Sequence, residues 1–144
     1  MTAQNGFTYL RGPAPSVVHV PRLLVAEPDE EINTLINFWA EGDKIQLVRA
    51  QTAKEALELV QDAAFIGTSL HGLLVDFELP DHTGMRIIRE FQDEFPGMPV
   101  GVTALDSVLS LEIWARARNV ELLRKPILAP KLVTFLERLN AKAS

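Results

Sequence analysis

The sequence predicts a doubly wound α/β fold, in which five βα units build one parallel five-stranded sheet with helices on both faces. Short apolar runs alternate five times with segments whose apolar residues recur at helical spacing. The connections between them are short, which favours right-handed crossovers that cover both faces of a parallel sheet. The 144 residues suit one domain with a sizeable core.

Five apolar runs mark the expected strands, at residues 22–26, 45–50, 72–77, 100–103 and 120–123. The run 72–77 reads Gly-Leu-Leu-Val-Asp-Phe and is apolar on both faces, as is typical of a central strand in a parallel sheet. We therefore place this strand in the middle of the sheet.

Each strand is followed by a helical pattern. Pro28 suits the first position of the first helix, three acidic residues load its first turn, and Gly42 ends it. Thr52-Ala-Lys-Glu55 is a capping-box pattern that opens a second helix to about Ala63, before a loop at 65–70. The remaining helices are expected at 84–94, at 107–118 and from Pro130, the last with an apolar stripe of Leu132, Phe135, Leu136 and Leu139.

Residues 1–20 are expected to form a flexible N-terminal extension, because glycines and prolines interrupt any periodicity there. Val17, Val18 and Val20 leave open a short edge strand. We expect a single domain over residues 21–144. Whether the chain is a stand-alone protein or a fragment of a longer one stays open.

The composition excludes several functions. With a net charge of -5, the chain offers no electrostatic reason to bind nucleic acid or an anionic membrane. The absence of cysteine rules out disulfides, thiolate metal sites and cysteine nucleophiles. No apolar stretch is long enough to span a bilayer and no secretory signal is visible. We expect a cytoplasmic protein.

Polar residues follow four of the predicted strands. Asp76 lies at the end of the central strand. Glu27 and Asp29 come after the first strand, Thr103 ends the fourth, and Lys125 comes after the fifth. Because chemistry in open parallel sheets gathers outside the carboxyl ends of the strands, these side chains are expected to converge. Such a set suits phosphoryl transfer to a carboxylate, with Asp76 as the nucleophile and the hydroxyl and ammonium binding phosphoryl oxygens.

Over residues 22–141 the chain resembles the response-regulator receiver family. Four motifs carry the resemblance: Leu23-Leu-Val-Ala-Glu27, Val75-Asp76-Phe-Glu-Leu-Pro80 with Gly84, Thr103-Ala104 and Lys125-Pro126. The resemblance implies a receiver fold with strand order 2-1-3-4-5 and a cis Lys125–Pro126 bond. It implies the following roles: Asp76 as phosphoacceptor; Thr103 and Lys125 as phosphate-binding residues; Glu27, Asp29, Asp76 and the backbone carbonyl of Glu78 as ligands of a weakened Mg²⁺ site; Ala104, Leu122 and Pro126 as residues that respond to phosphorylation.

Three positions depart from the family pattern. Proline stands at position 28, where the family has a second acid that is the principal metal ligand, so metal affinity should be weakened. Leu122 replaces the aromatic residue that reports phosphorylation to the far face. Leu79 stands where the family often has methionine, which is a mild change.

The resemblance implies a two-component signalling protein in a phosphorelay, not a metabolic enzyme. Its partners would be a histidine kinase or phosphotransfer protein, and a downstream protein bound through the face of the fourth and fifth helices. Leu109, Ile113 and Trp114 are candidates for that face, and a homodimer stays open.

Two other functions remain. A degenerate pseudo-receiver would keep the fold as a phosphorylation-independent interaction module, with Lys125 and Asp76 as an internal salt bridge. An unrelated doubly wound enzyme has no glycine-rich nucleotide-binding or nucleophile motif to support it. Asp29 could simply complement the helix dipole, and Thr103 could simply end its strand.

Overall fold

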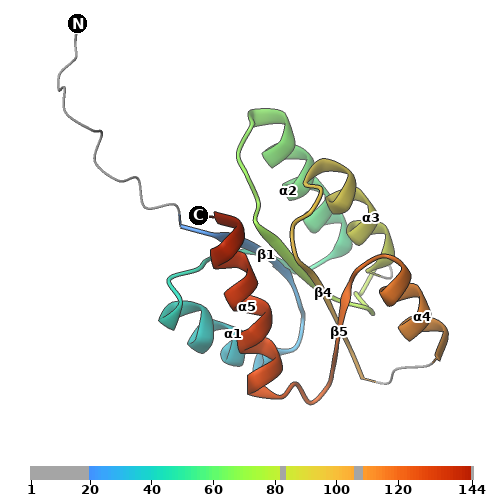
Figure 1. The fold of residues 1–144 in the computed structure, drawn as a ribbon. Coiled ribbons are helices and arrows are strands. Elements are labelled where there is room, and N and C mark those ends of the chain that lie inside the picture. Colours follow the sequence, from blue (N-terminus) through green and yellow to red (C-terminus); the bar gives the residue numbers. More distant parts are fainter. Residues whose placement is uncertain (1–19, 82–83, 106–108, 144) are drawn as a thin grey trace, which may run out of the picture.

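The computed structural model describes residues 20–81, 84–105 and 109–143, which form a parallel five-stranded sheet between two layers of helices (Figure 1). The strands are β1 (Arg22–Ala26), β2 (Gln46–Ala50), β3 (Gly72–Asp76), β4 (Val100–Ala104) and β5 (Glu121–Arg124). Their order in the sheet is β2-β1-β3-β4-β5. The predicted fold class and strand order are confirmed, and every residue of β3 is buried.

The helices divide between the two faces of the sheet. One face is covered by α1 (Glu30–Gly42) and α5 (Ala129–Ala143). The other is covered by α2 (Ala53–Ile66), α3 (Met85–Glu94) and α4 (Leu109–Ala117). This two-sided cover explains why β3 reads as a continuous apolar run.

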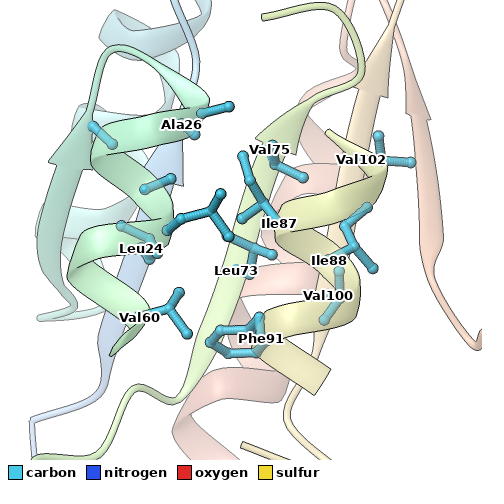
Figure 2. Close-up of a cluster of buried hydrophobic side chains, with 14 of the residues drawn as sticks. Leu24, Ala26, Val60, Leu73, Val75, Ile87, Ile88, Phe91, Val100 and Val102 are labelled. Carbon is cyan, nitrogen blue, oxygen red and sulfur yellow. The ribbon is translucent and has the colours of Figure 1, made fainter. Parts of the chain in front are cut away.

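The core on the α2 and α3 side is a dense apolar cluster, shown in Figure 2. Leu73 and Val75 of β3 face the α3 side chains Ile87 and Phe91, and Val60 reaches the cluster from α2. Phe91 is fully buried. Burying a side chain of this kind stabilises the fold by about 1.5–3 kcal/mol.

The core on the α1 and α5 side rests on two helical stripes. The predicted α5 stripe of Leu132, Phe135, Leu136 and Leu139 is completely buried. On α1, Ile32 and Ile36 are buried while Leu35 and Trp39 are half-buried. The helical spacing therefore identified the inward face of α5.

Several helix ends differ from the sequence prediction by one to three residues, and two of these differences have a clear local cause. The first helix begins at Glu30 rather than at Pro28, because Asp29 is its N-cap and accepts hydrogen bonds from the N–H groups of Glu31 and Ile32. The second helix continues to Ile66, past its expected end near Ala63. It stops at Gly67, whose φ of 77° is left-handed.

The capping box at the start of α2 is only half formed. The Thr52 hydroxyl accepts a hydrogen bond from the Glu55 N–H, as predicted. The Glu55 carboxylate, however, accepts from the N–H of Gln51, one residue earlier than the pattern implies.

Two expectations lie outside the described residues: the extension up to residue 19 and the start of the fourth helix at 107. Val20 is described and has no regular secondary structure. Within the described parts of the chain, no helix is long and apolar enough to cross a membrane.

Gly84 allows the loop after β3 to pass close to the strand. A Cβ at this position would lie 2.7 Å from the backbone oxygen of Asp76 and 3.0 Å from Cγ2 of Val75. The Gly84 N–H donates to the Phe77 carbonyl at 2.8 Å, which holds the two segments together. The closeness of this contact makes any side chain at position 84 a steric problem.

We expect Gly84→Ala to lower the free energy of unfolding by about 1–3 kcal/mol, because backbone atoms must shift to admit the methyl group. Gly42→Ala is the matched control. It has nothing within 4 Å of the added Cβ and should leave stability unchanged or raise it by up to about 1 kcal/mol. Urea unfolding measures both, and equal effects would contradict the close-contact explanation.

Candidate functional site

The register of the sheet brings four polar residues to one edge. Ala26 of β1 pairs with Val75, Asp76 pairs with Thr103, and Ala104 pairs with Arg124. Asp76 and Thr103 therefore lie side by side, Glu27 follows Ala26 next to Asp76, and Lys125 follows β5 two residues beyond the position level with Thr103. All four lie at the same edge of the sheet. We call these four residues the strand-end site. The structure thus brings together four of the five residues that the sequence analysis expected to converge, while the fifth, Asp29, caps α1.

Lys125 joins the two acids of the strand-end site. Its Nζ lies 2.9 Å from Oδ2 of Asp76 and 3.2 Å from Oε2 of Glu27. The side chains of Asp76 and Lys125 are only 9% and 10% exposed, and that of Glu27 is not exposed. The predicted alternative of a Lys125–Asp76 salt bridge is present in the structure, with Glu27 as a third member.

Glu27 is held by donors on all sides. The Thr103 hydroxyl donates to Oε1 at 2.6 Å, and the Asp29 N–H donates to Oε2 at 3.1 Å. Its backbone carbonyl accepts from Nδ2 of Asn33 at 2.7 Å. Both carboxylate oxygens of this buried acid are thus engaged, which offsets the cost of burying its charge.

Asp76 has one further donor in the loop that follows β3. The Glu78 N–H donates to Oδ1 at 2.9 Å. The backbone N–H of Phe77 donates to the Thr103 carbonyl at 2.8 Å, which continues the β3–β4 ladder past Asp76. Two donors therefore fix the Asp76 carboxylate, one on each oxygen.

The protonation of the site follows from burial and from the mixed charges. Burial raises the pKa of the Glu27 carboxyl, and the nearby Asp76 charge adds to this, although the Thr103 hydrogen bond opposes it. For Lys125, burial lowers the pKa, but the hydrogen bond to Asp76 and the Glu27 charge outweigh it, so the net pKa is raised.

Both shifts favour the native state at lower pH, but their contributions are lost in different pH ranges. The raised pKa of Lys125 stabilises the native state below the ordinary lysine pKa, and this is lost as the pH rises through the folded-state pKa. The raised pKa of Glu27 favours the native state at acidic pH, and that contribution declines as the pH rises through its folded-state pKa.

The acids do not form a metal centre in this arrangement. Among residues 20–81, 84–105 and 109–143, no three histidine, cysteine, aspartate or glutamate side chains are placed to hold a metal ion. Asp29 caps α1, Pro28 has no side-chain ligand, and the Glu27 oxygens accept hydrogen bonds from the chain itself. The proposed side-chain ligands Glu27, Asp29 and Asp76 are thus engaged by donors of the chain itself and do not present the near-ideal octahedral oxygen set that Mg²⁺ requires.

The residues expected to respond to phosphorylation have mixed surroundings. Ala104 is buried and its carbonyl accepts the Lys125 N–H at 2.8 Å. Leu122 is half-buried and packs against the apolar core on the α2 and α3 side. The Lys125–Pro126 bond is cis, as the resemblance implies, and Pro126 is exposed.

Sequence reasoning missed two polar residues that support the site. Asn33 holds the Glu27 carbonyl and lies beside Arg49, which also contacts Asn37. Asp81 accepts from the N–H groups of Ala53 and Lys54 at 2.8 and 3.0 Å, so it ties the loop after β3 to α2. Short polar side chains in loops and first turns carry no periodic signal, and only the folded chain reveals these contacts.

Two of the three residues predicted for a contact face on α4 are exposed in the structure. Leu109 and Ile113 are 71% and 59% exposed. Trp114 is instead half-buried and packs against the core. An open groove beside α4 runs to the start of α5 and is lined by residues that include Arg116, Leu122, Leu128 and Lys131.

No protein-family model and no curated protein matches the sequence. Solved structures do match. A receiver-domain protein from Methanospirillum hungatei is 20% identical over 85% of this chain and 96% of its own, with a TM-score of 0.72. A receiver-domain protein from Clostridium thermocellum is 25% identical over the same shares, also with a TM-score of 0.72. A response regulator from Burkholderia pseudomallei is 18% identical over 85% of this chain and 69% of its own, with a TM-score of 0.68. Its structure carries a phosphorylated aspartic acid, a calcium ion and citrate. These likenesses confirm the receiver fold.

Lys125 is expected to be the residue on which the stability of the strand-end site depends. In Lys125→Met the Glu27 and Asp76 carboxylates lose the cation between them, which should lower the free energy of unfolding by about 3–5 kcal/mol. Urea unfolding followed by tryptophan fluorescence measures the loss. Adding Asp76→Asn should recover part of it, because one of the two buried charges is then gone.

Arg138→Ala is the surface control for this experiment. Arg138 pairs with Glu121 with side chains 45% and 28% exposed, and its loss should cost less than about 1 kcal/mol. Equal losses in Lys125→Met and Arg138→Ala, or no recovery in the double variant, would show that the buried ion pair is not what stabilises this edge of the sheet.

Proposed function

We propose that this chain is a receiver-type module of two-component signal transduction, in which Asp76 accepts a phosphoryl group from the phosphohistidine of a histidine kinase or phosphotransfer protein. The observation that carries the proposal is the position of Asp76. Its carboxylate ends the central strand, 2.9 Å from the Lys125 ammonium and beside Thr103 in the sheet register. We place this activity in the cytoplasm, and the folded module in residues 21–144.

The transfer needs a nucleophile and groups that bind phosphoryl oxygens. A carboxylate oxygen of Asp76 attacks phosphorus, the phosphorus–nitrogen bond of the donor breaks, and its electron pair stays on the imidazole nitrogen. The product is an acyl phosphate on Asp76. Lys125 and Thr103 bind the transferred oxygens, since such transfer depends mainly on positioning and charge stabilisation. Water later hydrolyses the acyl phosphate and resets the module.

The fold likeness supports this proposal. The matched response regulator from Burkholderia pseudomallei carries a phosphorylated aspartic acid. In this chain we assign the same role to Asp76, because it is a buried acid in contact with Lys125.

The signal leaves the module by protein contact. We assign the output to the face of α4 and α5, where Leu109, Ile113 and Leu128 are exposed. A downstream protein, or a second copy of the chain, would cover these apolar side chains. Leu122 cannot act as an aromatic reporter, so any change at Asp76 reaches this face through Ala104, Lys125 and Pro126.

A second function is favoured by one specific observation. Glu27 binds both Thr103 and Lys125, and the acids of the described chain form no metal cluster. A pseudo-receiver that uses the same face for phosphorylation-independent binding would have no need of a free oxyanion position or a metal ion. The two functions share the fold and differ in whether Asp76 is modified.

Exposure of the protein to a small phosphodonor with Mg²⁺ separates the two functions. A receiver should gain one phosphate-sized adduct by intact mass, because Asp76 is the nucleophile. Asp76→Asn should gain none, and Glu58→Gln, which changes an exposed acid on α2, should behave as the wild type. An unmodified wild type, or an adduct that persists in Asp76→Asn, would remove the phosphoacceptor function.

Mg²⁺ affinity should be limited by position 28. We expect the wild type to bind Mg²⁺ weakly, and Glu27→Asp/Pro28→Asp, which restores a pair of adjacent acids, to bind it at least about tenfold more tightly. Isothermal titration calorimetry measures both. Pro28→Ala, which adds no ligand, is the control. If the wild type binds Mg²⁺ as tightly as the double variant, Pro28 does not weaken the site. If this wild-type binding is also lost in Asp76→Asn, the result weighs against the pseudo-receiver.

A further inference from the structure

The Glu27 carboxylate occupies a complete set of anion donors. Oε1 accepts from the Thr103 hydroxyl at 2.6 Å. Oε2 accepts from the backbone N–H of Asp29 at 3.1 Å and from the Lys125 ammonium at 3.2 Å. The side chain is fully buried, so this carboxylate is not accessible to solvent.

These three donors are of the kinds that proteins use to bind oxyanions. One is a hydroxyl, one an ammonium, and the third is a backbone N–H at the N-cap of the 13-residue helix α1, where the helix dipole is positive. Two of them, Thr103 and Lys125, are the groups to which we assigned the phosphoryl oxygens. Glu27 thus lies where an incoming oxyanion would be bound.

We propose that Glu27 is a built-in ligand of an oxyanion site formed by Thr103, Lys125 and the Asp29 N–H, and that it competes with a phosphoryl group for this site. The inference rests on the proposed function in one respect, which is that the competing oxyanion is a phosphoryl group. The occupied site itself is a property of the unmodified chain.

Charge makes the two occupants mutually exclusive. The site holds two carboxylates and one ammonium, with both acids in contact with the same Nζ. A phosphoryl group on Asp76 would bring a charge of about -2 at neutral pH. With Glu27 in place, Lys125 would be the one cation that the described residues place in contact with these charges, so modification of Asp76 favours the departure of Glu27 from its donors.

The length of the side chain makes the contact possible. The Glu27 backbone is fixed by its carbonyl bond to Asn33, at 2.7 Å, so the carboxylate reaches Thr103 only through its two methylene groups. An aspartate is one methylene shorter and could not span the same donors from this backbone position. Glutamate at position 27 is therefore the residue that closes the site.

Rescue by a free carboxylate tests the built-in ligand without any phosphorylation. Glu27→Ala should be destabilised in chloride and stabilised by formate at constant ionic strength, since formate supplies the missing carboxylate. At formate tenfold above its dissociation constant, the unfolding equilibrium constant should fall about tenfold. The wild type, the exposed-acid control Glu30→Ala, and Glu27→Ala/Lys125→Met should show no such saturable effect in urea unfolding.

Glu27→Ser keeps a small polar group in the site and is the second variant to use if Glu27→Ala does not fold. Folding of either variant only in the presence of formate counts as rescue. If neither variant responds to formate, or neither folds in it, the proposal is overturned. A response to formate that persists in Glu27→Ala/Lys125→Met would overturn it as well.

Phosphorylation rates then separate this inference from the proposed function. With a small phosphodonor, Glu27→Gln should form the Asp76 adduct about tenfold faster than the wild type, as expected if one competing charge is removed. Formate rescue without an adduct in any variant leaves the built-in ligand standing and removes the phosphoacceptor function. If the wild type is phosphorylated, but formate rescues no variant and Glu27→Gln reacts no faster, the built-in ligand is overturned and the phosphoacceptor function stands.

Discussion

The Lys125 ammonium between the Glu27 and Asp76 carboxylates is the interaction on which this edge of the molecule depends. Two acids lie at the ends of adjacent buried strands, and among the described residues the Lys125 ammonium, 2.9 and 3.2 Å from them, is the cation in contact with both. The distances are short enough for hydrogen bonds, and nearly complete burial removes most screening by water. Whatever the module does must therefore preserve this charge balance or use a change in it as the signal.

The fold was largely predictable, for a physical reason that can be followed in particular residues. β3 is buried on both faces and so reads as an unbroken apolar run. The α5 stripe must face the sheet and so repeats at 3.6 residues. Helix ends were less predictable, since they depend on single hydrogen bonds: Asp29 rather than Pro28 determined the start of α1, and Gly67 determined the end of α2.

The candidate site was predictable as a set of positions but not as a network. Parallel strands deliver their carboxyl ends to one edge, so the meeting of Asp76, Thr103 and Lys125 followed from their order in the sequence. The direction in which Glu27 points did not follow, because it depends on side-chain torsions and on competing donors. The sequence left the Thr103 hydroxyl free to bind an anion, whereas in the structure this hydroxyl donates to the Glu27 carboxylate.

Asp81 has a mechanical consequence that extends beyond the charged cluster. Its carboxylate holds the first two N–H groups of α2, at 2.8 and 3.0 Å, across 28 and 27 residues of sequence. The segment that leaves Asp76 is in this way tethered to a second helix on the α2 and α3 face. A displacement of Asp81 would either carry the first turn of α2 with it or free these two N–H groups, so the position of the loop after β3 is coupled to α2.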